Sequence, residues 1–237
     1  MADVRTLMLI ASLAVLTACG GGEAPTPPVP APTPVPASAP PACIPKAQVK
    51  VQLFGDSTMV GSVAGVYIGD VAGKLQADLD ARFGVGATTV ELRAVGGTTA
   101  ADLLAGRDGL NAPWPGSVDG DVVVENHGIN DMLYLKDLAG YTANLERLAG
   151  RVTLFQTPVR STEAWWNDAY AQAMRDVAAE HHIPVAEVHE YFRGRQELLS
   201  DGVHPTVEGY ALLVRDVLAP AVAEQVKALR CMEVSHG

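Results

Sequence analysis

Short apolar segments alternate with amphipathic segments between residues 46 and 230. Five segments have the length and apolar character of strands, the third being typical of a buried parallel strand: residues 49–54, 88–94, 121–125, 152–156 and 183–188. Between them, apolar side chains recur every three or four residues, as on one face of a helix, in residues 71–79, 138–148 and 163–182. A last helical stripe begins after Pro205, and Pro220 is expected to kink or end that helix.

This alternation of strands and helices predicts an α/β fold. A parallel sheet with helices on both faces buries such strands on both sides. Five strands suit a single flavodoxin-like, three-layer α/β/α domain with strand order 2-1-3-4-5, which we place at residues 46–231, followed by a C-terminal tail at 232–237. In sheets of this kind, binding sites lie at the carboxyl ends of the strands.

The N-terminal segment has the pattern of an export signal. An uncharged apolar run at residues 7–16 follows Arg5 and is short for a membrane span, so residues 1–18 are predicted to be a signal peptide. Leu-Thr-Ala-Cys at 16–19, followed by three glycines, resembles the lipobox of bacterial lipoproteins, which implies lipidation of Cys19. Gly20 then favours the outer membrane, with the domain in the periplasm or at the cell surface. The alternative is an ordinary signal peptide in which Cys19 is incidental.

Residues 19–45 are predicted to be a tether, because frequent proline favours an extended chain without a packed core. Cys43 and Cys231 flank the predicted domain, and export would place them in an oxidising compartment. We therefore expect a Cys43–Cys231 disulfide, with two free thiols as the alternative. The composition is 48% hydrophobic and 19% charged, which suits a globular core, and the net charge of -10 without a basic stripe argues against a nucleic-acid partner.

Four predicted loops after strands carry residue types that can do chemistry. They contain Ser57 after the first strand, Gly96 and Gly97 after the second, Asn130 after the third, and an Asp201-x-x-His204 segment after the fifth, listed here in chain order. Taken alone, the first three loops are more typical of ordinary turns than of a site, and the Asp201-x-x-His204 segment is equally consistent with a helix cap. Together they offer a nucleophile, a backbone donor, an amide donor and an acid–base pair at one edge of the sheet.

The order Ser, Gly, Asn, Asp-x-x-His resembles that of the GDSL-type esterases, the SGNH hydrolases. The resemblance covers about residues 49–220 and includes Gly128-x-Asn130-Asp131 and a His-Pro pair at 204–205 followed by Gly-Tyr at 209–210. Two positions depart from the family pattern. Thr58 replaces the leucine of the first motif, and Arg93 stands near a position where many members have asparagine.

The resemblance implies a role for each matching residue. Ser57 would be the nucleophile, His204 the general base and then the general acid, and Asp201 the carboxylate that orients His204. The backbone N–H groups of Ser57 and Gly97, with the side-chain amide of Asn130, would form an oxyanion hole. Gly96 would take the place of Gly97 if the alignment of the second loop shifts by one residue.

The expected activity is that of a serine ester hydrolase that uses neither a metal nor another cofactor. The substrate would be a small-molecule or glycan ester. The alternatives are a thioesterase or lysophospholipase, a carbohydrate O-acetylesterase, and a ligand-binding lipoprotein without catalysis. Met59, His127 and Trp165 are candidates for the substrate pocket, with packing roles as the alternative for His127 and Trp165. Asp131 is expected to support the Asn130 loop through hydrogen bonds.

Overall fold

The computed structural model describes residues 45–162 and 167–232, and all of them belong to one compact unit, Ala42–Gly237. The expected signal peptide at 1–18 lies outside the described residues, as do Cys19, Cys43, Trp165 and nearly all of the tether and the tail. Within the described ranges, no helix combines the length and the apolar character needed to cross a membrane.

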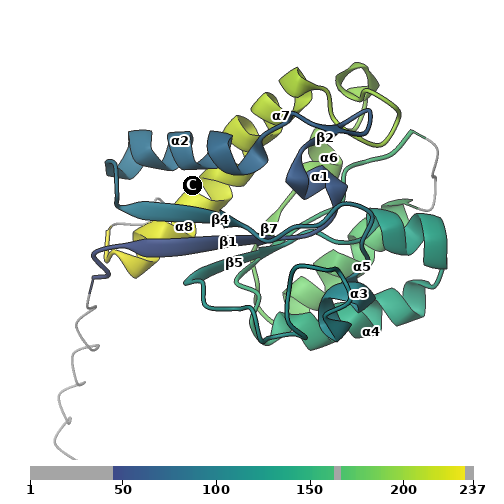
Figure 1. The fold of residues 1–237 in the computed structure, drawn as a ribbon, viewed down its shortest axis with the longest axis horizontal. Coiled ribbons are helices and arrows are strands. Elements are labelled where there is room, and N and C mark those ends of the chain that lie inside the picture. Colours follow the sequence, from purple (N-terminus) through teal and green to yellow (C-terminus); the bar gives the residue numbers. More distant parts are fainter. Residues whose placement is uncertain (1–44, 163–166, 233–237) are drawn as a thin grey trace, which may run out of the picture. The chain divides into compact units, whose positions relative to one another are not determined.

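Five parallel strands form the central sheet, in the order β4-β1-β5-β6-β7 (Figure 1). Their bounds are β1 Val49–Phe54, β4 Thr88–Leu92, β5 Val122–Glu125, β6 Leu154–Gln156 and β7 Val185–Ala186. Along the chain these are the first to fifth strands of the sheet, so the observed order is 2-1-3-4-5. The predicted fold class is confirmed, including the strand order.

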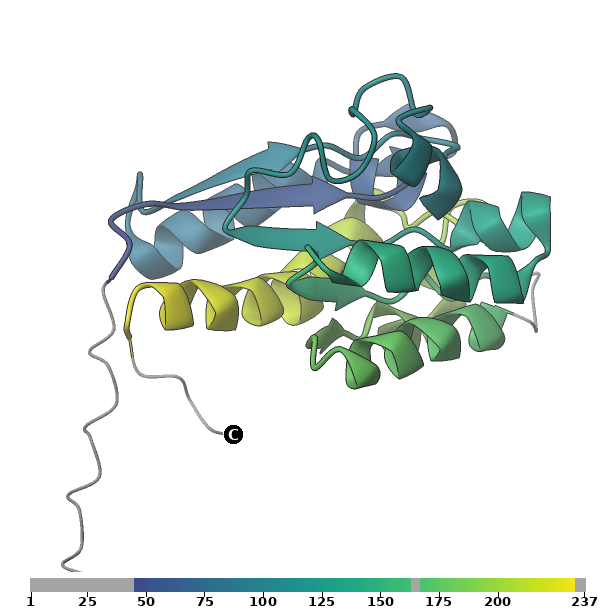
Figure 2. The same cartoon turned by 90° about the horizontal axis from the view of Figure 1, so that it is seen from below.

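Helices cover both faces of the sheet and complete three layers (Figures 1 and 2). One face packs against α2 (Val71–Phe83), α7 (Val207–Leu213), the π-helix η3 (Val214–Leu218) and α8 (Ala219–Leu229). The other face packs against α3 (Ala100–Ala105), α4 (Leu138–Ala149) and α5 (Asn167–Glu180). The remaining elements are short: α1 (Ser57–Val60), the π-helix η1 (Asp131–Leu135), α6 (Val188–Tyr191), the 3-10 helix η2 (Gln196–Leu198), and a hairpin of β2 (Ser62–Val63) and β3 (Val66–Tyr67).

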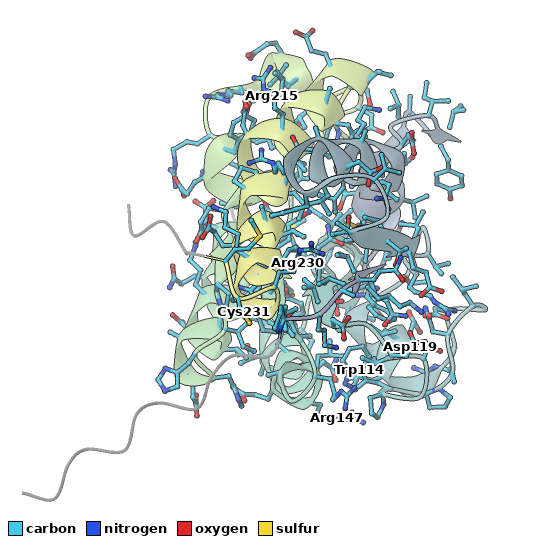
Figure 3. The ribbon with its side chains drawn as sticks, turned by 90° about the vertical axis from the view of Figure 1, so that its left-hand side faces the viewer. Trp114, Asp119, Arg147, Arg215, Arg230 and Cys231 are labelled. Carbon is cyan, nitrogen blue, oxygen red and sulfur yellow. The ribbon has the colours of Figure 1, made fainter. Side chains whose placement is uncertain are left out.

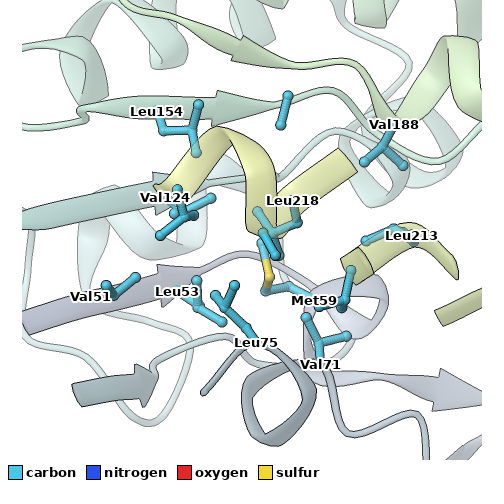
Figure 4. Packing of buried hydrophobic residues seen from close by; sticks show 14 of the residues in the cluster. Val51, Leu53, Met59, Val71, Leu75, Val124, Leu154, Val188, Leu213 and Leu218 are labelled. Atoms are coloured by element: carbon cyan, nitrogen blue, oxygen red, sulfur yellow. The ribbon is translucent and has the colours of Figure 1, made fainter. Parts of the chain in front are cut away.

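Strand β1 contributes side chains to both hydrophobic layers. Val51 and Leu53 belong to the cluster that includes Leu75 of α2 and Leu218 of η3 (Figure 4), whereas Phe54 belongs to the cluster on the opposite face. All five side chains are fully buried. Burying one such side chain contributes roughly 1.5–3 kcal/mol. The strand that leads directly to Ser57 is therefore held from both sides.

The last helical segment continues past Pro220, so of the two predicted alternatives, a kink or an end at this proline, the end is wrong. The π-helix η3 precedes Pro220, and the Ala219 N–H bonds to the Val214 carbonyl, five residues back. Pro220 lies in the first turn of α8 but inside a continuous helix, where its ring and its missing N–H disfavour an ordinary α-helical turn. The wider π turn thus lets the chain remain helical from Val207 to Leu229.

The two ends of the described domain lie side by side. Lys46 N donates to the Leu229 carbonyl at 3.0 Å, and Arg230 Nη1 donates to the Ala47 carbonyl at 2.8 Å. Figure 3 shows Arg230 and Cys231 at the end of α8. Cys231 is disulfide-bonded. The other cysteines of the chain lie outside the described residues, so its pairing with Cys43 stays a prediction.

Candidate active site

The four loops singled out in the sequence meet at one pocket of about 330 Å³. Ser57, Gly97 and Asn130 lie just after β1, β4 and β5, and Asp201 and His204 lie just before α7. All five residues line this pocket. Parallel strands have their carboxyl ends at one edge of the sheet, which is why residues so distant in the chain converge here.

Ser57, His204 and Asp201 form a continuous hydrogen-bonded chain. Ser57 Oγ lies 2.8 Å from His204 Nε2, and these residues are 147 positions apart in sequence. His204 Nδ1 lies 2.8 Å from Asp201 Oδ2. Because an ionised carboxylate only accepts hydrogen bonds, Nδ1 carries a proton, and the other ring nitrogen, Nε2, faces the serine hydroxyl.

A tight turn holds Asp201 beneath the imidazole. Asp201 Oδ1 accepts the backbone N–H groups of Val203 at 3.1 Å and of His204 at 2.8 Å. Partial burial alone would raise the pKa of Asp201, but these hydrogen bonds and the one from the imidazole lower it below its usual value. Gly202 has a φ of +82°, which favours glycine at this turn, and its carbonyl accepts the Thr162 N–H at 2.8 Å.

Ser57 begins the short helix α1, immediately after β1. Asp56 caps this helix: its Oδ1 accepts the Thr58 N–H at 2.9 Å and the Thr58 hydroxyl at 2.8 Å. Gly55 has a φ of +151°, and a Cβ there would lie 1.8 Å from Asn126 Oδ1. Only glycine therefore fits the turn that presents Ser57 at the sheet edge.

Three residues that line the pocket, Ser57, Gly97 and Asn130, each have a hydrogen-bond donor available. In the described part of the chain, the backbone N–H groups of Ser57 and Gly97 donate to no acceptor. Asn130 donates one amide hydrogen to the Thr98 carbonyl at 2.8 Å, which leaves its second hydrogen available. Gly97 has a φ of +81°. At Gly96, which also lines the pocket, a Cβ would lie 2.4 Å from the Tyr67 hydroxyl.

Two predicted pocket residues lie in the interior instead. Met59 is fully buried in the hydrophobic cluster under α2, as Figure 4 shows, and is absent from the pocket lining. His127 is also buried and does not reach the pocket. The helical turn of α1 points Met59 away from the side on which Ser57 is presented, and the Glu125 carboxylate draws the His127 ring inward. The third candidate, Trp165, lies outside the described residues.

A cluster of buried ionisable groups lies among the same loops. It contains Asp56, Glu125, His127 and Asp131, none more than 1% exposed. Burial by itself would lower the pKa of His127, but the Glu125 carboxylate, together with Asp56 and Asp131, outweighs burial and raises that pKa to about 9. Burial raises the pKa of Asp56 and raises the pKa of Asp131 to about 6. As expected, Asp131 supports the Asn130 loop, since its carboxylate accepts the Ala100 N–H at 3.2 Å.

Four residues near the site were not identified from the sequence. Two of them line the pocket, and two lie in the interior. Tyr67 of β3 and Tyr134 of η1 line the pocket while remaining 62% and 68% exposed. Inside the protein, Glu125 and Thr98 hold His127. A glutamate at the end of an otherwise apolar strand was a signal that could have identified Glu125, because a carboxylate buried there needs a partner. The two tyrosines gave no such signal, since they lie on elements too short to predict.

Metal-binding side chains do not gather in this region. Across residues 45–162 and 167–232, no group of three or more His, Cys, Asp or Glu side chains could hold a metal ion.

Solved structures with the same fold include several ester hydrolases. A lipase/acylhydrolase from Enterococcus faecalis is 20% identical with a TM-score of 0.60, over 80% of this chain and 100% of that chain. An acetyl xylan esterase from Geobacillus stearothermophilus is 20% identical with a TM-score of 0.58, over 75% and 94% of the two chains. An alpha/beta hydrolase from the metagenome of Lake Arreo, Spain, is 22% identical with a TM-score of 0.55, over 76% and 96%. No curated protein matches the chain.

The sequence profile of the GDSL-like Lipase/Acylhydrolase family matches residues 53–212, which is most of the described domain and contains every residue of the hydrogen-bonded chain and the donor set. The protein therefore belongs to the GDSL-like lipase/acylhydrolase family and is an enzyme that hydrolyses esters.

Proposed function

We propose that the protein is a serine ester hydrolase in which Ser57 is the nucleophile, His204 the general base and acid, and Asp201 the group that orients His204. The 2.8 Å contact between Ser57 Oγ and His204 Nε2 carries this proposal. A serine hydroxyl is a weak nucleophile until a base removes its proton. The carboxylate on Nδ1 fixes the tautomer in which Nε2 can take that proton, and it stabilises the imidazolium that results.

The reaction proceeds in two halves. Ser57 Oγ attacks the ester carbonyl carbon while its proton passes to His204 Nε2. The bond from the carbonyl carbon to the alcohol oxygen then breaks, and His204 returns the proton to the leaving alcohol. His204 next takes a proton from water, the water oxygen attacks the acyl carbon, and Ser57 leaves with the proton that His204 gives back. The products are a carboxylic acid, an alcohol and the free enzyme.

The donors facing Ser57 support an oxyanion hole. The Ser57 and Gly97 N–H groups and the second Asn130 amide hydrogen are available on the pocket side. When Ser57 attacks, the carbonyl oxygen gains negative charge, and donors already in place stabilise it without reorganisation. Losing one such donor typically costs about 10²–10³ in rate.

For the substrate we propose a small-molecule or glycan ester. Two specificities of the same machinery are the alternatives, a thioesterase or lysophospholipase and a carbohydrate O-acetylesterase. The exposed rings of Tyr67 and Tyr134 at the pocket favour an alcohol part with a flat or apolar face, because aromatic rings offer such groups contact area. The acetyl xylan esterase among the solved structures supports a test with acetylated glycans.

The test compares wild type with Ser57→Ala on p-nitrophenyl acetate, butyrate and octanoate, on acetylated xylan, on an acyl thioester and on a lysophospholipid. We expect the variant to lose hydrolysis of whichever substrates the wild type accepts, and the ranking of kcat/KM to identify the acyl length and alcohol class. Equal rates for both proteins would reject Ser57 as the nucleophile and favour a ligand-binding role for the pocket.

We also propose, from the sequence, that the enzyme is exported as a lipoprotein with the lipid on Cys19. Metabolic labelling with palmitate, followed by cell fractionation, tests this. Wild type should carry label in the outer membrane, and Cys19→Ser should lose both the label and the membrane association. A labelled Cys19→Ser protein would reject the assignment.

A further inference from the structure

A second histidine–carboxylate pair lies inside the protein, behind the loop that carries Gly97. His127 Nδ1 lies 2.9 Å from Glu125 Oε1 and 3.2 Å from Oε2, and the His127 backbone N–H donates to the same carboxylate at 2.9 Å. On the other side of the ring, Nε2 lies 3.1 Å from Thr98 Oγ1. His127 and Glu125 are buried from solvent.

The hydrogen atoms available along the Glu125–His127–Thr98 hydrogen bonds determine the protonation state of the His127 ring. The Thr98 hydroxyl has one hydrogen, and it points to the Val95 carbonyl, 2.7 Å away. Thr98 Oγ1 is then an acceptor toward His127, so Nε2 carries a hydrogen. Nδ1 faces an ionised carboxylate and carries one as well. Both ring nitrogens donate, and His127 is an imidazolium, in agreement with the raised pKa of this residue.

Thr98 connects this cation to the pocket. Its hydroxyl donates a hydrogen bond to the Val95 carbonyl and accepts one from His127. Its backbone carbonyl accepts a hydrogen bond from the Asn130 side-chain amide at 2.8 Å, and Thr98 directly follows Gly97. Thr98 therefore joins the loop that carries Gly97 to the loop that carries Asn130. Displacing its side chain would move the Gly97 N–H and release the Asn130 amide together.

We infer that His127 is a positioning residue for the oxyanion hole: held by Glu125, it fixes Thr98, and Thr98 sets the directions of the Gly97 and Asn130 donors. The inference rests on the proposed function, because it gives these donors a role in catalysis.

The first test uses matched variants of Thr98. Thr98→Val removes the hydroxyl and keeps the shape, and Thr98→Ser keeps the hydroxyl. With p-nitrophenyl acetate, we expect Thr98→Val to lower kcat by about 10- to 100-fold with KM changed by less than about threefold. Thr98→Ser should restore kcat to within about threefold of wild type. Equal kcat values for the two variants would overturn the inference.

The second test separates the two nitrogens of His127. The amide of His127→Gln can reach the place of Nε2 and donate to Thr98, whereas the amide of His127→Asn can reach only the place of Nδ1 and Glu125. We expect His127→Asn to lose as much kcat as Thr98→Val, His127→Gln to lose less, and the double variant His127→Asn/Thr98→Val to lose no more than Thr98→Val alone. A double loss equal to the product of the single losses would overturn the inference.

Two controls keep the outcomes distinct. His181 pairs with Glu146 at 2.6 Å on the surface, and His181→Asn, which breaks an equivalent pair away from the pocket, should leave kcat unchanged. If Ser57→Ala keeps wild-type activity, the proposed function fails. If Ser57→Ala is inactive while both Thr98 variants match wild type, the inference about His127 fails by itself. Should a His127 variant not fold, the Thr98 pair still decides.

Discussion

The two histidine–carboxylate pairs at this edge of the sheet have the same connectivity in different surroundings. In each, a carboxylate lies on Nδ1 and a hydroxyl on Nε2: Asp201–His204–Ser57 at the pocket, and Glu125–His127–Thr98 inside. The side chains of His204 and Asp201 are 20% and 37% exposed, whereas those of His127 and Glu125 are 2% and 0% exposed.

The hydroxyl proton distinguishes the two arrangements. Among the residues that the structure describes, His204 is the only hydrogen-bond partner of the Ser57 hydroxyl, so its proton can pass to the imidazole. The Thr98 hydroxyl gives its proton to the Val95 carbonyl, and the His127 ring already carries two. The same three functional groups therefore suit proton transfer in one place and a fixed support in the other. Residue types alone do not make a catalytic triad.

The largest expected effect separates Ser57 from Thr98. Ser57→Ala should lower kcat/KM for p-nitrophenyl acetate by at least about 10⁴-fold, because it removes the nucleophile. Thermal unfolding should be nearly unchanged, since this hydroxyl makes one hydrogen bond at the pocket surface. If Ser57→Ala keeps more than about a tenth of the wild-type rate, Ser57 is not the nucleophile, and the proposed difference between Ser57 and Thr98 is wrong.

The second effect concerns stability and the buried pair. The pKa of His127 is raised from 6.5 to about 9, so its contribution to stability is complete below pH 6.5 and is lost as the pH rises through about 9. We expect roughly 3 kcal/mol of unfolding free energy to be lost between about pH 6 and pH 10, as measured by urea unfolding. The other groups that face His127 are Glu125, Asp56 and Asp131, whose charges all favour the imidazolium.

The matched variant for this measurement is His127→Gln, which has no group that titrates in this range. Its unfolding free energy should vary less with pH than that of wild type. Parallel pH profiles for wild type and His127→Gln would contradict the assignment of a buried imidazolium.

A smaller effect is expected at the exposed carboxylate. Asp201→Asn should lower kcat by about 10- to 100-fold, less than the ~10⁴-fold known for a fully buried orienting carboxylate, because water reaches this pair. Its unfolding free energy should change by no more than about 1 kcal/mol, which is the usual net contribution of one hydrogen bond. The expectation fails if Asp201→Asn lowers the unfolding free energy by more than the loss of transition-state stabilisation calculated from kcat, since the pocket pair would then be mainly structural, like the buried pair.

The smallest effect is expected at the two exposed tyrosines that line the pocket. Tyr67→Ala and Tyr134→Ala should raise KM by about two- to fivefold for esters of bulky alcohols and leave kcat for p-nitrophenyl acetate nearly unchanged, since both rings are exposed and remote contacts contribute little each. The control is Tyr191→Ala, a tyrosine bonded to Asp216 outside the pocket. Equal KM values for the three variants would remove the tyrosines from substrate binding.

The sequence predicted the parts of the fold that repeat a simple pattern. The runs at β1 and β5 and the four-residue spacing in α2 depend on local periodicity, and the strand order followed from their number and alternation. Two-residue strands such as β2 and β3, and the π-helices η1 and η3, have too few residues to show a period. The fifth strand was predicted too long because Val188 continues its apolar pattern, yet it begins α6.

By itself, the sequence determined which functional groups follow which strands. Parallel strands bring their carboxyl ends to one edge of the sheet, so these groups were expected to lie close together. The convergence of Ser57, Asn130 and His204 at one pocket follows from that rule. Only the tertiary structure decided that His127 turns inward to Glu125 while His204 faces Ser57. Burial and the direction of single hydrogen bonds depend on residues from other strands. Contacts with such distant residues do not appear as a periodic pattern in the sequence.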